Sequence, residues 1–207
     1  MMLETALREV KAGRMILLHD SNGRENEVDM VINAAKTTAE TIRTMRRDGG
    51  GLICLAMSGD IADTLSLPYM TDLMTSSNDT VRRLIPERTA YGDKPAFSLS
   101  INHRKTYTGI TDNDRALTIT EFAKLEDQRQ FTENFYAPGH IHLLIAKSLR
   151  VRRGHTELSV ELARRAGVKE TMVLCEMMGD DHNALSVKEA EKYAKIHGIS
   201  FVDGGEL

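Results

Sequence analysis

Short apolar runs that alternate with helix-like segments constrain the fold of this chain more than any other feature. Residues 15–18, 52–56 and 172–175 form such runs, and their brevity is typical of buried strands. Before the first run, apolar residues recur at positions 3, 6, 7 and 10, which is the spacing of one helical face. We therefore expect an α+β fold with mixed α/β layers.

Capping residues mark where the expected helices begin and end. Gly13 ends the first helix, and Thr37 or Thr38 caps a second helix that stops at a triple glycine. Ser186 and Glu189 form a capping-box pattern, which predicts a helix near the end of the chain. Two further strands are expected, over residues 97–101 and 199–202.

Length and composition favour a single domain over residues 1–207. The 207 residues are 41% hydrophobic and 28% charged, which is ordinary for a globular protein. The net charge of -3 supplies no basic field for nucleic acid, and no apolar run approaches the ~20 residues that cross a bilayer. We expect a soluble cytoplasmic protein with neither nucleic-acid nor membrane partners. Cys54 and Cys175 each lie in an apolar run and are interpreted as buried core thiols.

A long polar stretch over about residues 67–96 contains three of the four prolines. Long loops in compact domains are usually either functional or disordered. Both interpretations, a lid and a disordered segment, stay open from the sequence.

The segment from Asp20 to Asp29 concentrates acidic side chains next to an apolar run. If the chain is extended there, Glu25, Glu27 and Asp29 share one face. Adjacent carboxylates repel one another and call for a divalent metal, a basic side chain or shared protons. A calcium EF-hand loop is excluded because Glu25 stands where glycine is required. A solvated acidic edge strand is the simpler alternative.

Basic residues precede a predicted helix in the stretch Arg152-Arg-Gly-His-Thr156. Thr156 is the expected N-cap, and Gly167 follows the helix. The helix dipole, free backbone N–H groups and two guanidinium groups favour a phosphate site, with His155 as a ligand or base. A solvated pair of arginines is the competing interpretation for Arg152 and Arg153.

Three further titratable groups stand out. A Pro-Gly turn is predicted to deliver His140 and, two residues later, His142. Glu176 directly follows the apolar run over 172–175, so burial would require a partner or a raised pKa, and a raised pKa suits acid–base chemistry.

Taken in order, these motifs resemble the 3,4-dihydroxy-2-butanone 4-phosphate synthase family of riboflavin biosynthesis. The motifs are Arg24-Glu-Asn-Glu-x-Asp29, Pro138-Gly-His140, Arg152-x-Gly-His-Thr-Glu157 and Leu174-Cys-Glu176, with support from residues 89–92 and 108–115. The resemblance covers nearly the whole chain. It implies conversion of ribulose 5-phosphate to 3,4-dihydroxy-2-butanone 4-phosphate and formate through a metal-stabilised enediolate.

The resemblance also implies roles for individual residues. Glu25 and His155 match metal ligands for magnesium, and the histidine leaves manganese open. His140 and Glu176 match an acid–base pair, while Glu27 and Asp20 would orient hydroxyl groups or metal-bound water. The substrate-binding set comprises Arg24, Glu25, Asp29, Thr111, Arg152, Arg153, Gly154, His155 and Thr156. Arg152 and Thr156 are the expected phosphate contacts, although Arg153, where many members have glycine, leaves open which arginine holds the phosphate.

Assembly and function class follow from the same resemblance. Family members are homodimers with active sites at the subunit interface, so His140 and the stretch from Thr111 to Arg115 are expected to reach a partner's metal. With two cysteines and no cysteine-rich zinc motif, the chain is expected to be monofunctional rather than fused to a GTP cyclohydrolase II domain. The alternatives are a metal-dependent sugar-phosphate isomerase or aldolase, which formate release would distinguish, and a non-catalytic phosphate-ligand binding module.

Overall fold

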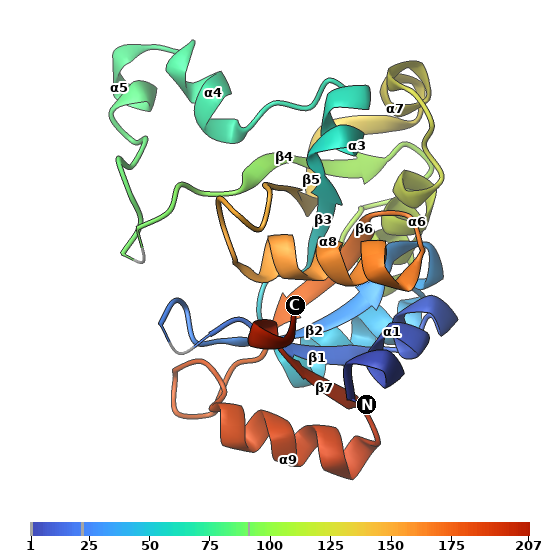
Figure 1. Cartoon of the computed structure of the whole chain (residues 1–207). Coiled ribbons are helices and arrows are strands. Elements are labelled where there is room, and N and C mark those ends of the chain that lie inside the picture. Colours follow the sequence, from blue (N-terminus) through green and yellow to red (C-terminus); the bar gives the residue numbers. More distant parts are fainter. Residues whose placement is uncertain (1, 22, 91) are drawn as a thin grey trace.

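A seven-stranded mixed sheet forms the centre of the fold in the computed structural model, which describes residues 2–21, 23–90 and 92–207 (Figure 1). Its strand order is β4-β5-β3-β6-β2-β1-β7. The pairs β1–β7 and β3–β5 are parallel, and the other neighbours are antiparallel. The strands are β1 (Ile16–His19), β2 (Val28–Asn33), β3 (Cys54–Ser58), β4 (Phe97–His103), β5 (Phe135–Ala146), β6 (Thr171–Glu176) and β7 (Ser200–Asp203).

Helices cover both faces of this sheet (Figure 1). Helices α1 (Met2–Ala12) and α8 (His155–Ala166) pack on one face, whereas α2 (Ala39–Thr44), α6 (Asp112–Ala123) and α9 (Val187–His197) supply buried residues to the other. The remaining elements are α3 (Gly59–Thr64), α4 (Met70–Thr75), α5 (Asp79–Arg82), α7 (Gln128–Asn134), η1 (Ala34–Lys36), η2 (Met45–Gly49) and η3 (Gly204–Glu206). The predicted mixed α/β layers are confirmed. No helix among the described residues is long and apolar enough to cross a membrane.

The alternation of side chains along β2 determines which groups face α8. Val28, Met30 and Ile32 belong to the core on the α2 and α6 face, as the period-two pattern predicts. Val31 belongs to the other core, beneath α1 and α8. Asp29, two residues before Val31, therefore points to the α8 face, where the candidate site lies.

Several predicted boundaries are confirmed. Thr38 caps α2, Ser186 caps α9, and Gly198 ends α9 in the left-handed conformation that glycine tolerates. Both cysteines are buried. The predicted strand over 52–56 begins later, at Cys54, because Gly51 and Leu52 bond to Glu176 instead of continuing a ladder.

Four local predictions are wrong. The extended segment is confined to β2, and Arg24 and Glu25 lie in a turn before it. Thr156 is not the N-cap of α8, because Gly154 holds that position and His155 begins the helix. The Pro138-Gly139-His140 stretch lies inside β5 rather than in a turn between elements. The long polar stretch is not a continuous loop, since it contains α4 and α5.

Candidate active site

The predicted acidic and acid–base groups meet at one edge of the sheet. Asp29 is paired with Leu18 on β1 and with Glu176 on β6. Asp20 follows the end of β1 and is buried. Because β2 runs antiparallel to both neighbours, the end of β1, the start of β2 and the end of β6 lie side by side.

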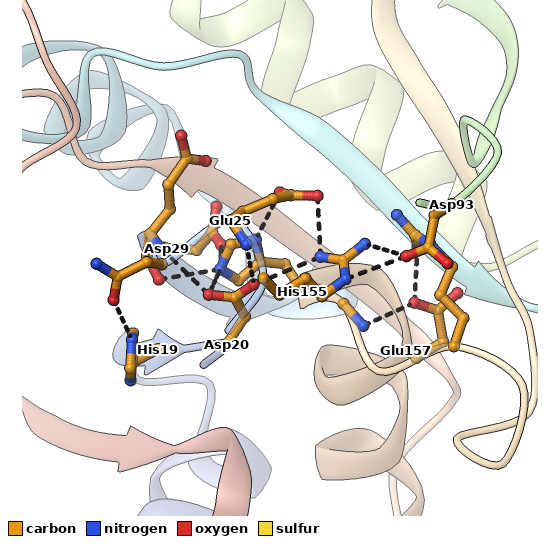
Figure 2. A network of polar contacts seen from close by, with 12 residues as sticks. His19, Asp20, Glu25, Asp29, Asp93, His155 and Glu157 are labelled. Carbon is orange, nitrogen blue, oxygen red and sulfur yellow. Dashed lines mark hydrogen bonds and ion pairs between the residues drawn. The ribbon is translucent and has the colours of Figure 1, made fainter. Parts of the chain in front are cut away.

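His155 at the start of α8 contacts the acidic groups (Figure 2). Its Nε2 atom lies 2.9 Å from an oxygen of Asp29, 3.8 Å from Asp20 and 3.1 Å from the carbonyl oxygen of Glu27. Its Nδ1 atom lies 3.5 Å from Glu25. Burial alone would lower the pKa of His155, but the surrounding carboxylates raise it well above its ordinary value.

Asp20 organises the turn that carries the other carboxylates. Its oxygens accept hydrogen bonds from the backbone N–H groups of Glu25 (3.1 Å) and Glu27 (3.2 Å). These bonds fix the backbone on both sides of Asn26, whose φ angle of 55° lies in the left-handed region. Burial and the charges of Glu25 and Asp29 raise the pKa of Glu27, so the three carboxylates act on one another electrostatically.

His19 ties this turn to the last strand. Its Nδ1 atom lies 3.0 Å from a carboxylate oxygen of Asp203 on β7, and its Nε2 atom lies 3.1 Å from the side-chain oxygen of Asn26. The hydrogen bond from His19 lowers the pKa of Asp203. The next residue, Gly204, is so close to Asp20 that a Cβ atom there would lie 2.6 Å from the Asp20 carbonyl oxygen.

The geometry suits a divalent cation. Asp20, Glu25 and His155 each offer a ligand atom, and these atoms lie within 4.8 Å of one another. Asp29 is fully buried, and the described residues offer its carboxylate the ion pair with His155 but no further hydrogen bond. Few hydrogen bonds replace the water that this buried carboxylate loses, so it is stabilised by a nearby positive charge, either protonated His155 or a metal ion.

Two arginines lie next to this cluster. The Arg24 guanidinium group contacts Glu25 Oε1 at 2.9 Å and Asp93 Oδ2 at 2.9 Å. Arg152 is buried, and it forms an ion pair with Glu157 at 2.7 Å and contacts Asp93 at 3.4 Å. Figure 2 shows Asp93 and Glu157 together on the side of the cluster away from His19.

Arg153 points elsewhere. It is exposed, donates a hydrogen bond to the carbonyl oxygen of Gly204 (3.1 Å), and lines a separate cavity of about 730 Å³ with Lys147 and Arg164. Thr156 is buried in the first turn of α8. The structure therefore brings Arg152, but not Arg153, to the acidic cluster.

Gly154 permits the close approach of Arg24 to the start of α8. A Cβ atom at this position would lie 2.6 Å from Cζ of Arg24. Its N–H group donates to Glu157 (3.2 Å), the same carboxylate that holds Arg152. The helix start, Arg24 and Arg152 thus form one packed unit.

Glu176 is suited to proton transfer near neutral pH. Burial, followed by the charge of Asp29, raises its pKa from 4.5 to about 7. Its Oε2 atom accepts a hydrogen bond from the backbone N–H group of Leu52 (2.8 Å), which fixes the carboxyl group against the residues that precede β3.

His140 lies on β5, at the same end of the strands as Glu176, and β3 separates its strand from β6. The register pairs Cys54 with both His142 and Leu174. His140 lies two residues before His142, and Glu176 lies two residues after Leu174, on oppositely directed strands. His140 is exposed, and its backbone N–H group donates to Asn102 (2.9 Å).

Thr111 is not brought to the cluster within this chain. It caps α6 and accepts a hydrogen bond from the N–H group of Asp114 (3.1 Å). None of its contacts among the described residues is with the acidic turn or with α8.

Four contributors to the site were missed by sequence reasoning. Asp93 contacts both arginines, His19 supports the acidic turn, and Asn102 holds the backbone of His140. Asp93 and Asn102 carry no local signal because each acts across a long sequence separation, and His19 depends in the same way on its distant partner Asp203. Glu157 stands three residues after Gly154, which is the capping-box spacing, so its position was detectable.

Comparisons with known proteins identify the family of the chain. A family model described as 3,4-dihydroxy-2-butanone 4-phosphate synthase matches residues 4–207. A relative of that name from Methanothermobacter thermautotrophicus is 44% identical over 100% of this chain and 94% of its own length. The Bacillus subtilis riboflavin biosynthesis protein RibBA is 38% identical over 97% of this chain but only 46% of its own length.

Solved structures have the same fold. The Candida albicans enzyme of that name has a TM-score of 0.78 and 29% identity, and the match covers 98% of this chain and 93% of that one. A further structure, of the enzyme in complex with two magnesium ions, has a TM-score of 0.80, 28% identity and the same coverage. From its sequence, fold and site, the chain belongs to the 3,4-dihydroxy-2-butanone 4-phosphate synthase family.

Proposed function

We propose that this chain is a lyase of riboflavin biosynthesis that converts ribulose 5-phosphate to 3,4-dihydroxy-2-butanone 4-phosphate and formate. One observation carries the proposal beyond family membership: the candidate metal ligands Asp20, Glu25 and His155 lie beside the two arginines at the start of α8. A metal-binding cluster next to a phosphate-binding helix start suits a phosphorylated sugar.

Glu25 and His155, with Asp20 as a third candidate, would hold the ion. Carboxylate oxygens favour magnesium, and the imidazole nitrogen makes manganese a second candidate. The bound cation supplies positive charge that polarises the substrate carbonyl group. Asp29 and Glu27 lie next to these ligands and would orient the substrate's hydroxyl groups.

The phosphate group would bind where α8 begins. Arg152 and Arg24 present guanidinium groups, and Gly154, His155 and Thr156 form the first turn, at the positive end of the helix dipole. Arg153, which lies against Gly204, is not part of this proposed site.

Glu176 and His140 would move the protons. A carboxyl group that titrates near pH 7 can accept a proton from the sugar and return it later in the same cycle. His140 is exposed in one chain, which suits a group that completes a site shared with a second copy.

We further propose a homodimer with active sites at the subunit interface. The exposed side chains of Leu52 before β3, Phe97 on β4 and Tyr136 on β5 would be covered by a partner. Tyr136 shares Asn102 with His140, and Phe97 contacts His142. In this arrangement, Thr111–Arg115 of one copy reaches the site of the other. A cytoplasmic location stays a prediction.

The decisive experiment measures formate release from ribulose 5-phosphate, with and without magnesium. We expect metal-dependent formate from the wild-type chain and at least a hundredfold less from His140→Ala. A sugar phosphate that is isomerised or cleaved without formate would instead indicate an isomerase or aldolase. Recovery of intact ribulose 5-phosphate from folded, magnesium-loaded protein would indicate a binding module.

A further inference from the structure

One carboxylate, that of Asp93, bridges both arginines of the proposed phosphate site. Its Oδ2 atom accepts hydrogen bonds from Arg24 Nε (3.1 Å) and Nη2 (2.9 Å), and it lies 3.4 Å from Arg152 Nε. A single acceptor shared by two guanidinium groups has the geometry with which such groups bind a phosphate oxygen. Asp93 therefore occupies the position on these arginines that suits an anion.

The charges of both arginines are already balanced in this arrangement. Arg24 contacts Asp20 and Glu25 in addition to Asp93, and Arg152 contacts Glu157 in addition to Asp93. A sugar phosphate carries nearly two negative charges at neutral pH. Bringing it against the same guanidinium groups while Asp93 stays in place would put like charges together in a largely buried site.

We propose that the Asp93 carboxylate competes with the phosphate group of the substrate for Arg24 and Arg152, and that substrate binding displaces the turn that carries Asp93. The exchange replaces one anion with another, so both arginines keep a partner throughout. The remaining carboxylate on Arg152, Glu157, is fully buried and also accepts from the N–H group of Gly154, so it holds this arginine in place during the exchange.

The segment that carries Asp93 is built to separate from the body of the protein. Tyr69 packs against the core, but the described residues from Ile85 to Lys94 are half-buried or exposed, so moving the turn around Asp93 exposes little apolar surface. Asp93 itself is held in a local turn, in which its carbonyl oxygen accepts hydrogen bonds from the N–H and hydroxyl groups of Thr89. The turn can therefore move as a unit without breaking the core.

This inference rests on the proposed function, because it takes Arg24 and Arg152 as the phosphate contacts. Inorganic phosphate is a suitable probe, since it binds without being turned over. Calorimetric titration of the full chain would give its dissociation constant for the wild type, Asp93→Asn and Asp93→Ala. Asparagine keeps an oxygen that can accept from Arg24 but removes the competing charge. The matched control is Asp72→Asn, which removes the same charge from α4 of the same segment.

We expect both Asp93 variants to bind phosphate roughly three to ten times more tightly than the wild type, with less than a twofold change for Asp72→Asn. Unchanged, weaker or undetectable phosphate binding in Asp93→Asn would overturn the competition. Formate release by the wild type is measured separately, so a failed competition in an active enzyme leaves the proposed function standing.

Hydrogen exchange provides a second readout of the displacement. Saturating phosphate should speed hydrogen exchange of the backbone amides of Gly92 and Asp93, because their turn would move away from Arg24 and Arg152. Slower hydrogen exchange at these amides would mean that the segment closes over the phosphate. That result would contradict the displacement of Asp93.

Discussion

Asp29 and Glu176 occupy directly paired positions on the antiparallel strands β2 and β6. Burial disfavours the ionised form of Glu176, and the charge of Asp29 on the neighbouring strand adds to this effect. Burial together with this pairing thus explains how Glu176 acquires a pKa of about 7 at the proposed active site.

Glu176→Gln should lower activity while raising stability at alkaline pH. The folded state of the wild type binds the Glu176 proton more tightly than the unfolded state does, so its stability falls as the pH rises from about 4.5 to about 7. Glutamine stays neutral and still accepts from Leu52. Thermal unfolding at pH 8 should therefore occur roughly 2–4 °C higher in the variant, with formate release at least ~100-fold slower. Equal unfolding temperatures at pH 8 would argue against the raised pKa.

Glu25→Gln tests the metal assignment. Replacing the carboxylate by an amide removes a negative charge from a candidate ligand, so magnesium affinity should fall by roughly ten- to a hundredfold and turnover should be lost. Calorimetric titration with magnesium measures the affinity directly. Glu40→Gln, on the exposed surface of α2, is the control for loss of one carboxylate. If Glu25→Gln kept the magnesium affinity and magnesium dependence of the wild type, Glu25 would not be a metal ligand.

Arg152→Ala should weaken substrate binding more than Arg153→Ala. Arg152 shares Asp93 with Arg24 beside the acidic cluster, whereas Arg153 contacts Gly204. The Michaelis constant should rise by roughly tenfold or more for the former and less than twofold for the latter. The reverse ranking would assign the phosphate to Arg153.

Removal of Arg152 also leaves Glu157 buried without its cation, which lowers stability. Arg152→Lys therefore provides a variant that keeps a charge for Glu157 but loses the planar guanidinium group. A lysine variant that folds like the wild type and still binds substrate weakly would separate phosphate binding from stability.

Gly154→Ala should weaken substrate binding through Arg24. The added methyl group would collide with the guanidinium group, which would have to leave the start of α8. Gly23→Ala is a matched control in the neighbouring turn, because a Cβ atom there meets no atom within 4 Å. We expect a roughly tenfold loss of affinity in the first variant and wild-type affinity in the second, measured by phosphate titration.

His19→Ala should weaken magnesium binding although His19 is not a candidate ligand. The histidine holds Asn26, which lies between Glu25 and Glu27 in the acidic turn. A loss of roughly tenfold in affinity is expected, by analogy with other residues that orient metal ligands. His197→Ala, at an exposed position near the end of α9, is the control. Additive effects of His19→Ala and Asn26→Gly would exclude coupling between the two side chains.

Local patterns predicted much of the fold because helix caps and apolar runs act over a few residues. The strand β5 was missed because Pro138 and Gly139 are turn residues in most contexts. Here Gly139 lies so close to β4 that a Cβ atom would come within 2.0 Å of the backbone of Ile101, a contact that only tertiary structure creates.

The candidate site was predicted where charged groups cluster in sequence and missed where they come from a distance. The acidic turn and the start of α8 each carry an unusual pattern, so Glu25 and His155 were identifiable. Asp93 lies in a polar segment in which nothing distinguishes it from other exposed acids. Its role follows only from the folded chain, which brings it between Arg24 and Arg152.

The contact of the final turn with the acidic turn matters for protein engineering. Asp203 holds His19, and Gly204 lies against the backbone of Asp20, so η3 supports the same turn that carries the candidate metal ligands. A purification tag or fusion partner joined at residue 207 would begin three residues after this contact. A group attached there would lie close to the support of Asp20, so metal affinity should be compared before and after its removal.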